Sequence, residues 1–405
     1  MSDPLPLDGV KVVDVSWVMV GPSVARYLAD YGATVIHVES ASRVDTARTL
    51  GPFWEGIPGA ERSGAYANWN AGKLGLTLNL ALPEAREVFR RLVKWTDVVI
   101  ESFSPKAMRA WGLGYDSLRQ IKPDLIMVST CLHGQTGPQA QFAGYGNLSA
   151  ALTGFVGFVG WPDRPPAGPA GAYTDYISPK FITAALLAAL DYRRRTGRGQ
   201  YIDASQAEAA LHFLSTALLD YTVNGRLPAQ VGNRSDEAVP HGVYRCIGED
   251  CWCAIAVHSE SQWTALCRAT GNQAWLEDPR FATLRARRQH EDALDELVQE
   301  WASQRTPQDV ERTLQAAGVP AHAVLNTDEV FADAQLAYRG HFVEVEHAEL
   351  GTVPVEGSRF RLSRTPAEIR TAGPTFGQHS QYVLRDLLGL SDEEISELAA
   401  CGALE

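Results

Sequence analysis

Cysteine is scarce in this sequence, with six residues among 405. That number is too small for the disulfide framework of a secreted scaffold, and no two cysteines stand at the C-x2-C spacing of a zinc site. Cys251 and Cys253 are separated by one residue, so on a strand their side chains would point the same way, with no second pair to complete a tetrahedron. We therefore expect ordinary core thiols and no bound metal.

Clustered positive charge is also missing. The chain has 36 Lys and Arg against 48 Asp and Glu, which gives a formal net charge of −12. The densest basic group, Arg193 to Arg195, is too small for a polybasic membrane patch. Binding to a phosphate backbone needs clustered Lys and Arg. We therefore expect neither nucleic acid nor a membrane surface as a partner.

Long apolar runs do not occur either. The longest stretch without Asp, Glu, Lys or Arg, Leu125 to Pro162, is interrupted repeatedly by Gly, Gln and Pro, so it is not expected to span a bilayer. The segment Met1 to Leu7 has neither the basic nor the apolar region of a secretory signal. These features predict a cytoplasmic protein.

The motifs of several large enzyme classes are absent. The sequence contains no G-x-x-x-x-G-K-[ST], no G-x-S-x-G and no H-E-x-x-H. The turn from Val15 to Gly21 has one glycine where a dinucleotide site needs three, and Trp17 and Met19 would block the approach of a pyrophosphate. Although Glu39 ends the second predicted strand, a nicotinamide or flavin site is therefore not expected.

What the sequence does contain is an alternation of strands and helices. Apolar strands are predicted at 10–15, 34–39, 97–100 and 125–129, and helices at 23–31 and from Pro83 onwards. This alternation predicts right-handed βαβ units and an α/β fold with a parallel sheet. The loops after these strands contain glycine, proline and polar residues, which are either simple turns or ligand-binding loops at the carboxyl edge of the sheet.

Asp175 is the residue that stands out for its chemistry. An aspartate before a long helix is usually its cap, but here Ser178 followed by Pro179 is expected to cap a helix that starts at Pro179. No basic residue lies between Arg164 and Lys180. Asp175 is therefore either a helix cap or an isolated carboxylate that acts as a nucleophile and forms an acyl intermediate.

In their order along the chain, several segments resemble the class III CoA-transferases, the formyl-CoA transferase/carnitine CoA-transferase (CaiB/BaiF) family. The resemblance extends over nearly all 405 residues. The segments that carry it are 7–14, 21–22, 28–33, 35–39, 70–73, 97–105, 112–113, 134–138, 195–200, 240–244 and 318–321.

The resemblance implies a Rossmann-like large domain, with a parallel sheet made from both chain ends, and a small central α/β domain. The implied boundaries are 1–225 for the first part of the large domain, 226–330 for the small domain with its linker, and 331–405 for the last part of the large domain. An interlocked dimer is also implied, either a homodimer or a heteromer with a homologous subunit.

The catalytic aspartate of the family falls on Asp175. In the implied reaction this carboxylate attacks a donor such as succinyl-CoA, and CoA passes through an aspartyl anhydride and an aspartyl-CoA thioester to an acceptor acid. CoA is then a substrate, and no tightly bound cofactor is expected. The CoA contacts of the family carry over onto Val18, Met19, Val20, Leu78, Asn79, Ser102, Phe103, Ser104 and Arg109.

The chain departs from the family pattern where CoA phosphates would be bound. Ser40 and Ala71 stand where the family often has arginine. The phosphates are therefore expected to be held by other cations, with Arg43, Lys73 and Lys106 as candidates.

Two alternatives to acyl transfer to a carboxylic acid remain open. A 2-methylacyl-CoA racemase needs a histidine paired with an aspartate, and the segment Gly144 to Leu148, where racemases carry it, has none; His133 lies upstream. A CoA-binding subunit of a heteromeric transferase would not need Asp175. The apolar segment 150–158 suits a bulky or aromatic acyl group. Segments 144–161 and 240–246 most resemble family branches that act on aromatic or dicarboxylic acids, so the resemblance implies an acceptor of that kind, similar to benzylsuccinate.

Overall fold

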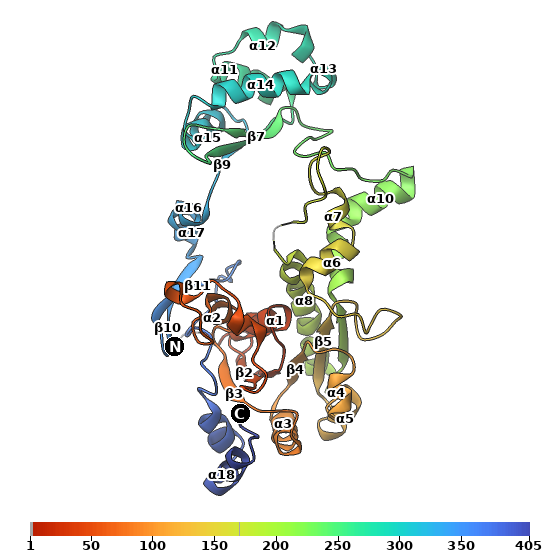
Figure 1. The fold of residues 1–405 in the computed structure, drawn as a ribbon, viewed down its shortest axis with the longest axis vertical. Coiled ribbons are helices and arrows are strands. Elements are labelled where there is room, and N and C mark those ends of the chain that lie inside the picture. Colours follow the sequence, from red (N-terminus) through yellow and green to blue (C-terminus); the bar gives the residue numbers. More distant parts are fainter. Residues whose placement is uncertain (1–2, 170) are drawn as a thin grey trace. The chain divides into compact units, whose positions relative to one another are not determined.

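The computed structural model describes residues 3–169 and 171–405, which form two units (Figure 1). The large unit consists of Met1–Val156, Gly168–Leu227 and Ala334–Glu405, and the small unit consists of Gly157–Ala167 and Pro228–Asp333. Both ends of the chain therefore belong to the large unit, and the small unit is inserted between them.

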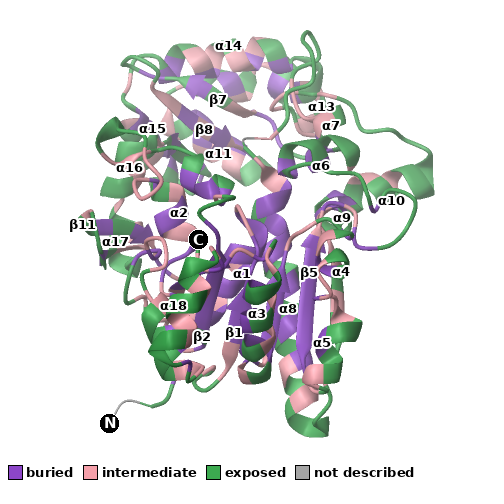
Figure 2. Ribbon diagram, turned by 60° about the horizontal axis from the view of Figure 1, so that its bottom comes forward, coloured by how far each residue is buried: buried purple, intermediate pink, exposed green. Residues whose placement is uncertain are grey.

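The large unit contains a six-stranded parallel sheet in the order β3-β2-β1-β4-β5-β6. Its strands are β1 (Lys11–Asp14), β2 (Thr34–Glu39), β3 (Leu74–Thr77), β4 (Val98–Glu101), β5 (Ile126–Cys131) and β6 (Tyr201–Ser205). The central strands are buried along their length (Figure 2), as expected for a parallel sheet covered on both faces. The predicted α/β fold with a parallel sheet is confirmed.

Each face of the sheet has its own core, because successive residues of a strand point to opposite sides. Val13 packs in the core that contains α3 (Pro83–Trp95). Its neighbour Val12 packs in the core that contains α1 (Val20–Ala29) and α8 (Tyr173–Thr196). The sheet is therefore covered by helices on both sides.

The strand order reverses between β1 and β4. The chain proceeds outward from β1 to β3, returns to the centre, and proceeds in the other direction from β4 to β6. Neighbouring loops at such a reversal leave in opposite directions, which opens a crevice at the carboxyl edge of the sheet. This edge is where α/β proteins bind ligands.

Shorter helices occupy the connections of the large unit. They are α2 (Gly64–Trp69), α4 (Ala107–Ala110), α5 (Tyr115–Ile121), α6 (Gly146–Leu152), α9 (Gln206–Leu211) and α10 (Ser215–Asn224), with α7 (Phe155–Phe158) at the boundary of the two units. Across the described ranges, 3–169 and 171–405, no helix combines the length and the apolar character that crossing a membrane requires.

Helix α8 begins earlier than the Ser178-Pro179 pair predicts. Its first residue is Tyr173. Ser178 Oγ donates to the carbonyl of Thr174 at 2.7 Å, so it bonds within the helix and does not cap it. Pro179 has no N–H for the carbonyl of Asp175, and burial of the long helix outweighs this one missing hydrogen bond. The predicted start was wrong, and Asp175 stands in the first turn of the helix.

Residues 334–405 return to the large unit, but the strands of the parallel sheet all come from the first part of the chain and not from both chain ends as expected. Their elements are α17 (Ala334–Arg339), the antiparallel strands β10 (Phe342–His347) and β11 (Gly351–Glu356), a π-helix (Tyr382–Leu387) and α18 (Asp392–Ala400). The N–H of Asn79 donates to the carbonyl of Ala403 at 2.9 Å. The last turn of the chain therefore lies beside the carboxyl end of β3.

The small unit is a three-stranded antiparallel sheet with helices. Its elements are β7 (His241–Arg245), β8 (Trp252–Ala256), α11 (Glu260–Ala269), α12 (Ala274–Glu277), α13 (Leu284–Gln289), α14 (Glu291–Ala302), α15 (Pro307–Ala316), β9 (Ala321–Val324) and α16 (Thr327–Ala332). A separate apolar core, which includes Trp263 and Phe281, lies beneath this sheet.

Candidate active site at the carboxyl edge of the sheet

The loops that follow β1 and β4 meet where the strand order reverses. The N–H of Trp17 donates to Oγ of Ser102 at 2.9 Å. The ring of Phe103 makes edge-to-face contacts with Trp17 and with Trp111, and the ring centroids are 5.4 Å apart in both pairs. Three aromatic rings therefore form one wall of the crevice.

A pocket of about 140 Å³, which we call the crevice pocket, opens beside these rings. The loops after β1, β2, β3 and β4 all contribute to its lining, including Leu78, Asn79 and Phe103 among the predicted CoA contacts. Met19 lines a second pocket, between α1 and α8. The remaining predicted contacts, which are Val18, Val20, Ser102, Ser104 and Arg109, do not line either pocket.

The carboxylate of Glu39, at the end of β2, is fully engaged by the protein itself. Arg48 donates to its two oxygens from Nε at 2.8 Å and from Nη2 at 2.7 Å, and the hydroxyl of Tyr66 donates at 2.9 Å. The Arg48 guanidinium lies between the rings of Tyr66 and Phe376. Because this acid is occupied, it is not free to hold a ribose diol as dinucleotide sites do, and Arg48, which also pairs with Glu61, compensates part of its charge.

Arg43 gives the crevice pocket its positive charge. Its guanidinium lies over the ring of Trp17, 5.2 Å from the centroid. Glu39 and Arg43 are the charged residues of the lining, and both oxygens of Glu39 are engaged by Arg48, which also pairs with Glu61. Arg43 is therefore the cation of this lining that can contact a bound anion. Lys106, another predicted phosphate ligand, is exposed at the start of α4 and outside this lining.

Lys73, the third predicted phosphate ligand, is held inside the protein. Its ammonium donates to Asp14 Oδ2 and Asn70 Oδ1, both at 2.8 Å, and to the carbonyl of Pro22 at 2.9 Å. Burial by itself raises the pKa of Asp14, but Lys73 and His37 outweigh it and hold that pKa well below its ordinary value. This cluster ties the end of β1 to α1 and to the turn before β3.

The loop after β1 has a strained conformation. Val18 has a φ of 66°, which is rare for a β-branched residue. Its N–H donates to Asp45 Oδ1 at 3.0 Å, and the N–H of Ser16 donates to Asp14 Oδ1 at 3.0 Å. Strain of this kind persists where the surroundings fix it, commonly at functional sites. Here it places Met19 at the start of α1.

Asp175, the predicted nucleophile, lies in the first turn of α8 and is 5% exposed. It packs against Gly146, where a Cβ would lie 2.6 Å from Asp175 Oδ1, so a larger residue does not fit. Burial raises the pKa of Asp175 to about 6, and the N–H of Gly146 acts in the opposite direction. Within residues 3–169 and 171–405, no lysine or arginine contributes to this shift. The carboxylate is therefore shielded from water without being neutralised.

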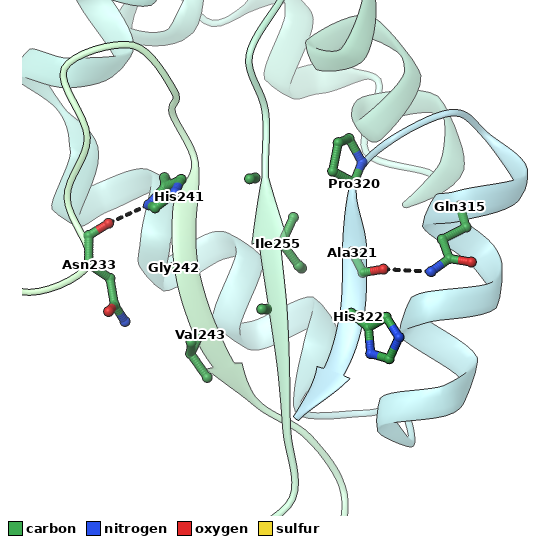
Figure 3. A pocket seen from close by; sticks show the side chains of 11 residues that line it. Asn233, His241, Gly242, Val243, Ile255, Gln315, Pro320, Ala321 and His322 are labelled. Atoms are coloured by element: carbon green, nitrogen blue, oxygen red, sulfur yellow. Dashed lines mark hydrogen bonds between the residues drawn. The ribbon is translucent and has the colours of Figure 1, made fainter. Parts of the chain in front are cut away.

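The small unit has a hollow of its own, with a volume of about 410 Å³ (Figure 3). His241 on β7 and His322 on β9 lie on its two outer strands. The ring of His241 is hydrogen-bonded to the carbonyl of Asn233, and Gln315 Nε2 donates to the carbonyl of Ala321 at 2.8 Å. The lining of this hollow is otherwise apolar and contains no carboxylate, lysine or arginine.

Comparison with known proteins identifies the class of protein. The model of CoA-transferase family III matches residues 7–380. The chain therefore belongs to CoA-transferase family III and is an enzyme of the CoA-transferase class. This confirms the family that the order of the sequence segments indicates.

Individual relatives and a solved structure agree with this assignment. Succinyl-CoA–D-citramalate CoA-transferase of Chloroflexus aurantiacus is 32% identical over 400 residues, which is 98% of each chain. Succinate–glutarate CoA-transferase of Agrobacterium fabrum is 34% identical over 385 residues, which is 94% of this chain and 96% of that one. The crystal structure of a CaiB/BaiF family protein from Brucella suis is similar with a TM-score of 0.87 and 33% identity, covering 95% of this chain and 100% of that one.

Sequence reasoning missed two features of this region. The pair of Glu39 and Arg48 has no local signal, because the arginine lies in a short 3-10 helix (Thr46–Thr49) after the strand and reaches back to it. The contact of Gly146 with Asp175 joins the first turns of two helices, α6 and α8, that are distant in the sequence. The glycine at the start of α6 is visible in the sequence, but its partner is not.

The buried ion pair predicts a large effect of Lys73→Met on stability. The substitution leaves the Asp14 carboxylate buried without its partner, so we expect the free energy of unfolding to fall by about 3–5 kcal/mol. Guanidinium denaturation measures this loss. Lys106→Met, at an exposed site, should change it by less than about 0.5 kcal/mol. If Lys73→Met keeps its stability and loses only CoA affinity, Lys73 binds phosphate and the structural role is wrong.

Proposed function

We propose that this CoA-transferase moves CoA from succinyl-CoA to a dicarboxylic acid, with Asp175 as the nucleophile. The observation that carries the proposal is the environment of the Asp175 carboxylate, which is buried at the start of α8, has a raised pKa and has no cation contributing to that pKa among the described residues. The choice of acids is supported by the two relatives, whose names pair succinate or succinyl-CoA with glutarate or D-citramalate. Both of these acceptors are dicarboxylic acids.

The first half of the reaction loads CoA onto the enzyme. An oxygen of Asp175 attacks the thioester carbonyl carbon of the donor, the C–S bond breaks, and CoA leaves as a thiolate. The product on the enzyme is a mixed anhydride. The thiolate then attacks the aspartyl carbonyl carbon, which releases the donor acid as a carboxylate and leaves an aspartyl-CoA thioester.

The second half passes CoA to the acceptor. The acceptor carboxylate attacks the aspartyl carbonyl carbon, which frees the thiolate and forms a second anhydride. The thiolate attacks the acyl carbon of the acceptor, which yields the new CoA ester and restores the carboxylate of Asp175. Each step exchanges one acyl bond for another, so the sequence balances without an oxidant, a reductant or a tightly bound cofactor.

The surroundings of the Asp175 carboxylate suit both halves of the reaction. Burial excludes the water that would hydrolyse an anhydride or a thioester. The N–H of Gly146 and the positive end of the helix dipole of α8 lie where negative charge develops on the carboxyl oxygens. The segment Gly144 to Leu148, which contains this glycine, has no imidazole to act as a second acid–base group, which disfavours the racemase alternative.

We assign the crevice pocket to the nucleotide part of CoA. Leu78, Asn79 and Phe103 line it. The other predicted contacts are Val18 and Met19 in the loop after β1, Val20 at the start of α1, Ser102 and Ser104 in the loop after β4, and Arg109 on α4. Arg43 is the cation that holds a phosphate group, in place of the arginine expected where Ser40 stands. An aromatic acceptor such as benzylsuccinate stays a prediction.

We also propose that the enzyme works as a dimer, either an interlocked homodimer or a heteromer with a homologous subunit. Apolar side chains of α10 and its flanking residues are strongly exposed. They are Phe213, Leu219, Tyr221, Val223 and Leu227, with exposures from 54% to 77%. Several large apolar side chains exposed on one short segment support a subunit interface there.

The nucleophile is tested by Asp175→Ala. Without this carboxylate no aspartyl intermediate forms, so we expect CoA exchange between succinyl-CoA and glutarate, followed by mass spectrometry, to fall at least about 10³-fold. Binding of CoA should persist. Asp116→Ala, which removes a carboxylate that is 90% exposed, is the matched control and should keep full activity. Surviving exchange in Asp175→Ala, or exchange of the α-proton without acyl transfer, would contradict the proposal.

The raised pKa of Asp175 predicts the pH dependence of the reaction. Only the ionised carboxylate attacks, so kcat/KM for succinyl-CoA should be constant above pH 6 and fall about tenfold per pH unit below it. Burial also raises the pKa of Glu101, to about 7, and this residue bonds the N–H of Phe103. The variant Glu101→Gln removes the titration of this second carboxyl group, and the fall of kcat/KM below pH 6 should remain. A flat profile between pH 5 and 8 would contradict the assignment.

The phosphate contact predicts the effect of Arg43→Ala. Loss of one charge-assisted hydrogen bond to a phosphate should raise KM for succinyl-CoA about tenfold and leave kcat within about twofold. Arg119→Ala, on an exposed face of α5, serves as the control. If the 3′-phosphate is the partner of Arg43, Arg43→Ala should not raise KM for the dephospho-CoA ester, which lacks that phosphate. Unchanged KM for both esters would exclude Arg43 from the CoA site.

A further inference from the structure

A second pocket of the large unit, which we call the α8 pocket, lies between α1, α8 and the end of β11. It has a volume of about 80 Å³, and its lining includes Met19, Tyr176, Lys180, Glu356 and Arg359. Helices α1 and α8 pack against each other in the core beneath it. The steps proposed above do not use any of the charged residues in this lining.

The lining of the α8 pocket carries an excess of positive charge. The guanidinium of Arg26 is buried and lies 3.7 Å from the carboxylate of Asp30, and Arg359 lies 2.6 Å from Glu356. Lys180 is the cation left over, since it forms no ion pair within the part of the chain that the structure describes. Burial, together with the nearby Arg359, lowers the pKa of Lys180, while Glu356 acts in the opposite direction. Its ammonium donates to the carbonyl of Tyr176, and among the described residues no carboxylate lies within ion-pair distance, so it is able to receive an anion.

Residues that line the α8 pocket follow the proposed nucleophile along α8. Pro179, which lines it, is four residues from Asp175, so both lie on one face of α8, roughly 6 Å apart along the helix axis. Tyr176, the residue after Asp175, also lines the pocket. Met19, from the strained loop after β1, borders it from the other side.

We infer that the α8 pocket binds the distal carboxylate of a dicarboxylic acyl group while the other carboxyl group reacts at Asp175. Lys180 pairs with this distal carboxylate, and the hydroxyl of Tyr176 is a second donor. The inference rests on the proposed function and adds to it a residue that selects diacids from monoacids.

The size of the pocket agrees with this ligand. The two carboxyl carbons of an extended four-carbon diacid are on the order of 4 Å apart, given C–C bonds of ~1.5 Å. That span is comparable to the one-turn offset between Asp175 and the residues of the pocket. A cavity holds one water in ~10–15 Å³, so about 80 Å³ accommodates a carboxylate with an adjoining methylene group.

Selection follows from the unpaired ammonium. A diacid places its distal carboxylate against the Lys180 ammonium, whereas a monoacid of the same length places an apolar chain end there. The flexible side chain of Lys180 lets the site accept diacids that differ by a methylene group. The donor and acceptor acyl groups use this subsite in turn.

The subsite is tested by exchange of an acid into its own CoA ester. Donor and acceptor then carry the same acyl group, so the rate reports on that one group. Labelled succinate is exchanged into succinyl-CoA, and labelled butyrate into butyryl-CoA, which lacks the distal carboxylate. In the wild-type enzyme we expect kcat/KM for the succinate pair to exceed that for the butyrate pair by at least about tenfold. Lys180→Met should lower this ratio by roughly 10- to 100-fold.

Two further variants serve as controls. Lys180→Arg keeps the charge and should retain most of the ratio. Lys94→Met, an exposed position on α3, should not change it. Because Lys180 is exposed on the surface of α8, its substitutions are not expected to disturb the fold, and the melting temperature checks this.

The possible outcomes separate the subsite from the proposed function. An equal fall of both exchanges in Lys180→Met would overturn the subsite and indicate a structural role. A wild-type enzyme that exchanges butyrate as fast as succinate would also overturn it, while CoA transfer at Asp175 stands. No exchange by the wild-type enzyme with either ester would overturn the proposed function and the subsite with it.

Discussion

The buried ion pair between Lys73 and Asp14 is the constraint on which the candidate site depends. The two charges are 2.8 Å apart inside the large unit, and the ammonium also bonds Asn70 and the carbonyl of Pro22. Removing two charges from water is costly, and their attraction compensates for it only when every partner is in place. The pair therefore holds the end of β1, the first turn of α1 and the turn before β3 in one arrangement. The strained loop 15–19 starts from that arrangement, and both the crevice pocket and the α8 pocket are bordered by this loop.

Local charge, and not the charge of the whole protein, governs binding in this account. The net charge of −12 disfavours anionic CoA esters at long range, but salt screens such fields beyond about 8–10 Å. Within that distance, Arg48 engages Glu39, and Arg43 is the cation that the crevice pocket presents to an anion. In the α8 pocket the corresponding cation is Lys180. Asp175 lies apart from these cations and keeps the negative charge that a nucleophile needs.

Much of the fold could be predicted from the sequence, because strands buried on both faces must be continuous apolar runs. The strands β1, β2, β4 and β5 lie close to their predicted positions. The start of α8 was predicted at Pro179 instead of Tyr173, since Ser178-Pro179 has the composition of a cap while burial of the helix decides its length. The α8 pocket could not be predicted, because Met19, Lys180 and Arg359 come together only through the tertiary fold. Asp175 could be singled out as an isolated carboxylate, but its contact with Gly146 could not.

The most direct measurement of the central claim is chemical trapping of the intermediate. The enzyme is mixed with succinyl-CoA and quenched with hydroxylamine, which converts an aspartyl anhydride or thioester into a hydroxamate, and its peptides are then analysed by mass spectrometry. The account predicts a hydroxamate on the peptide that contains Asp175, formed only in the presence of the CoA ester. Turnover of succinyl-CoA without modification of Asp175, or with modification of another carboxylate, would contradict it.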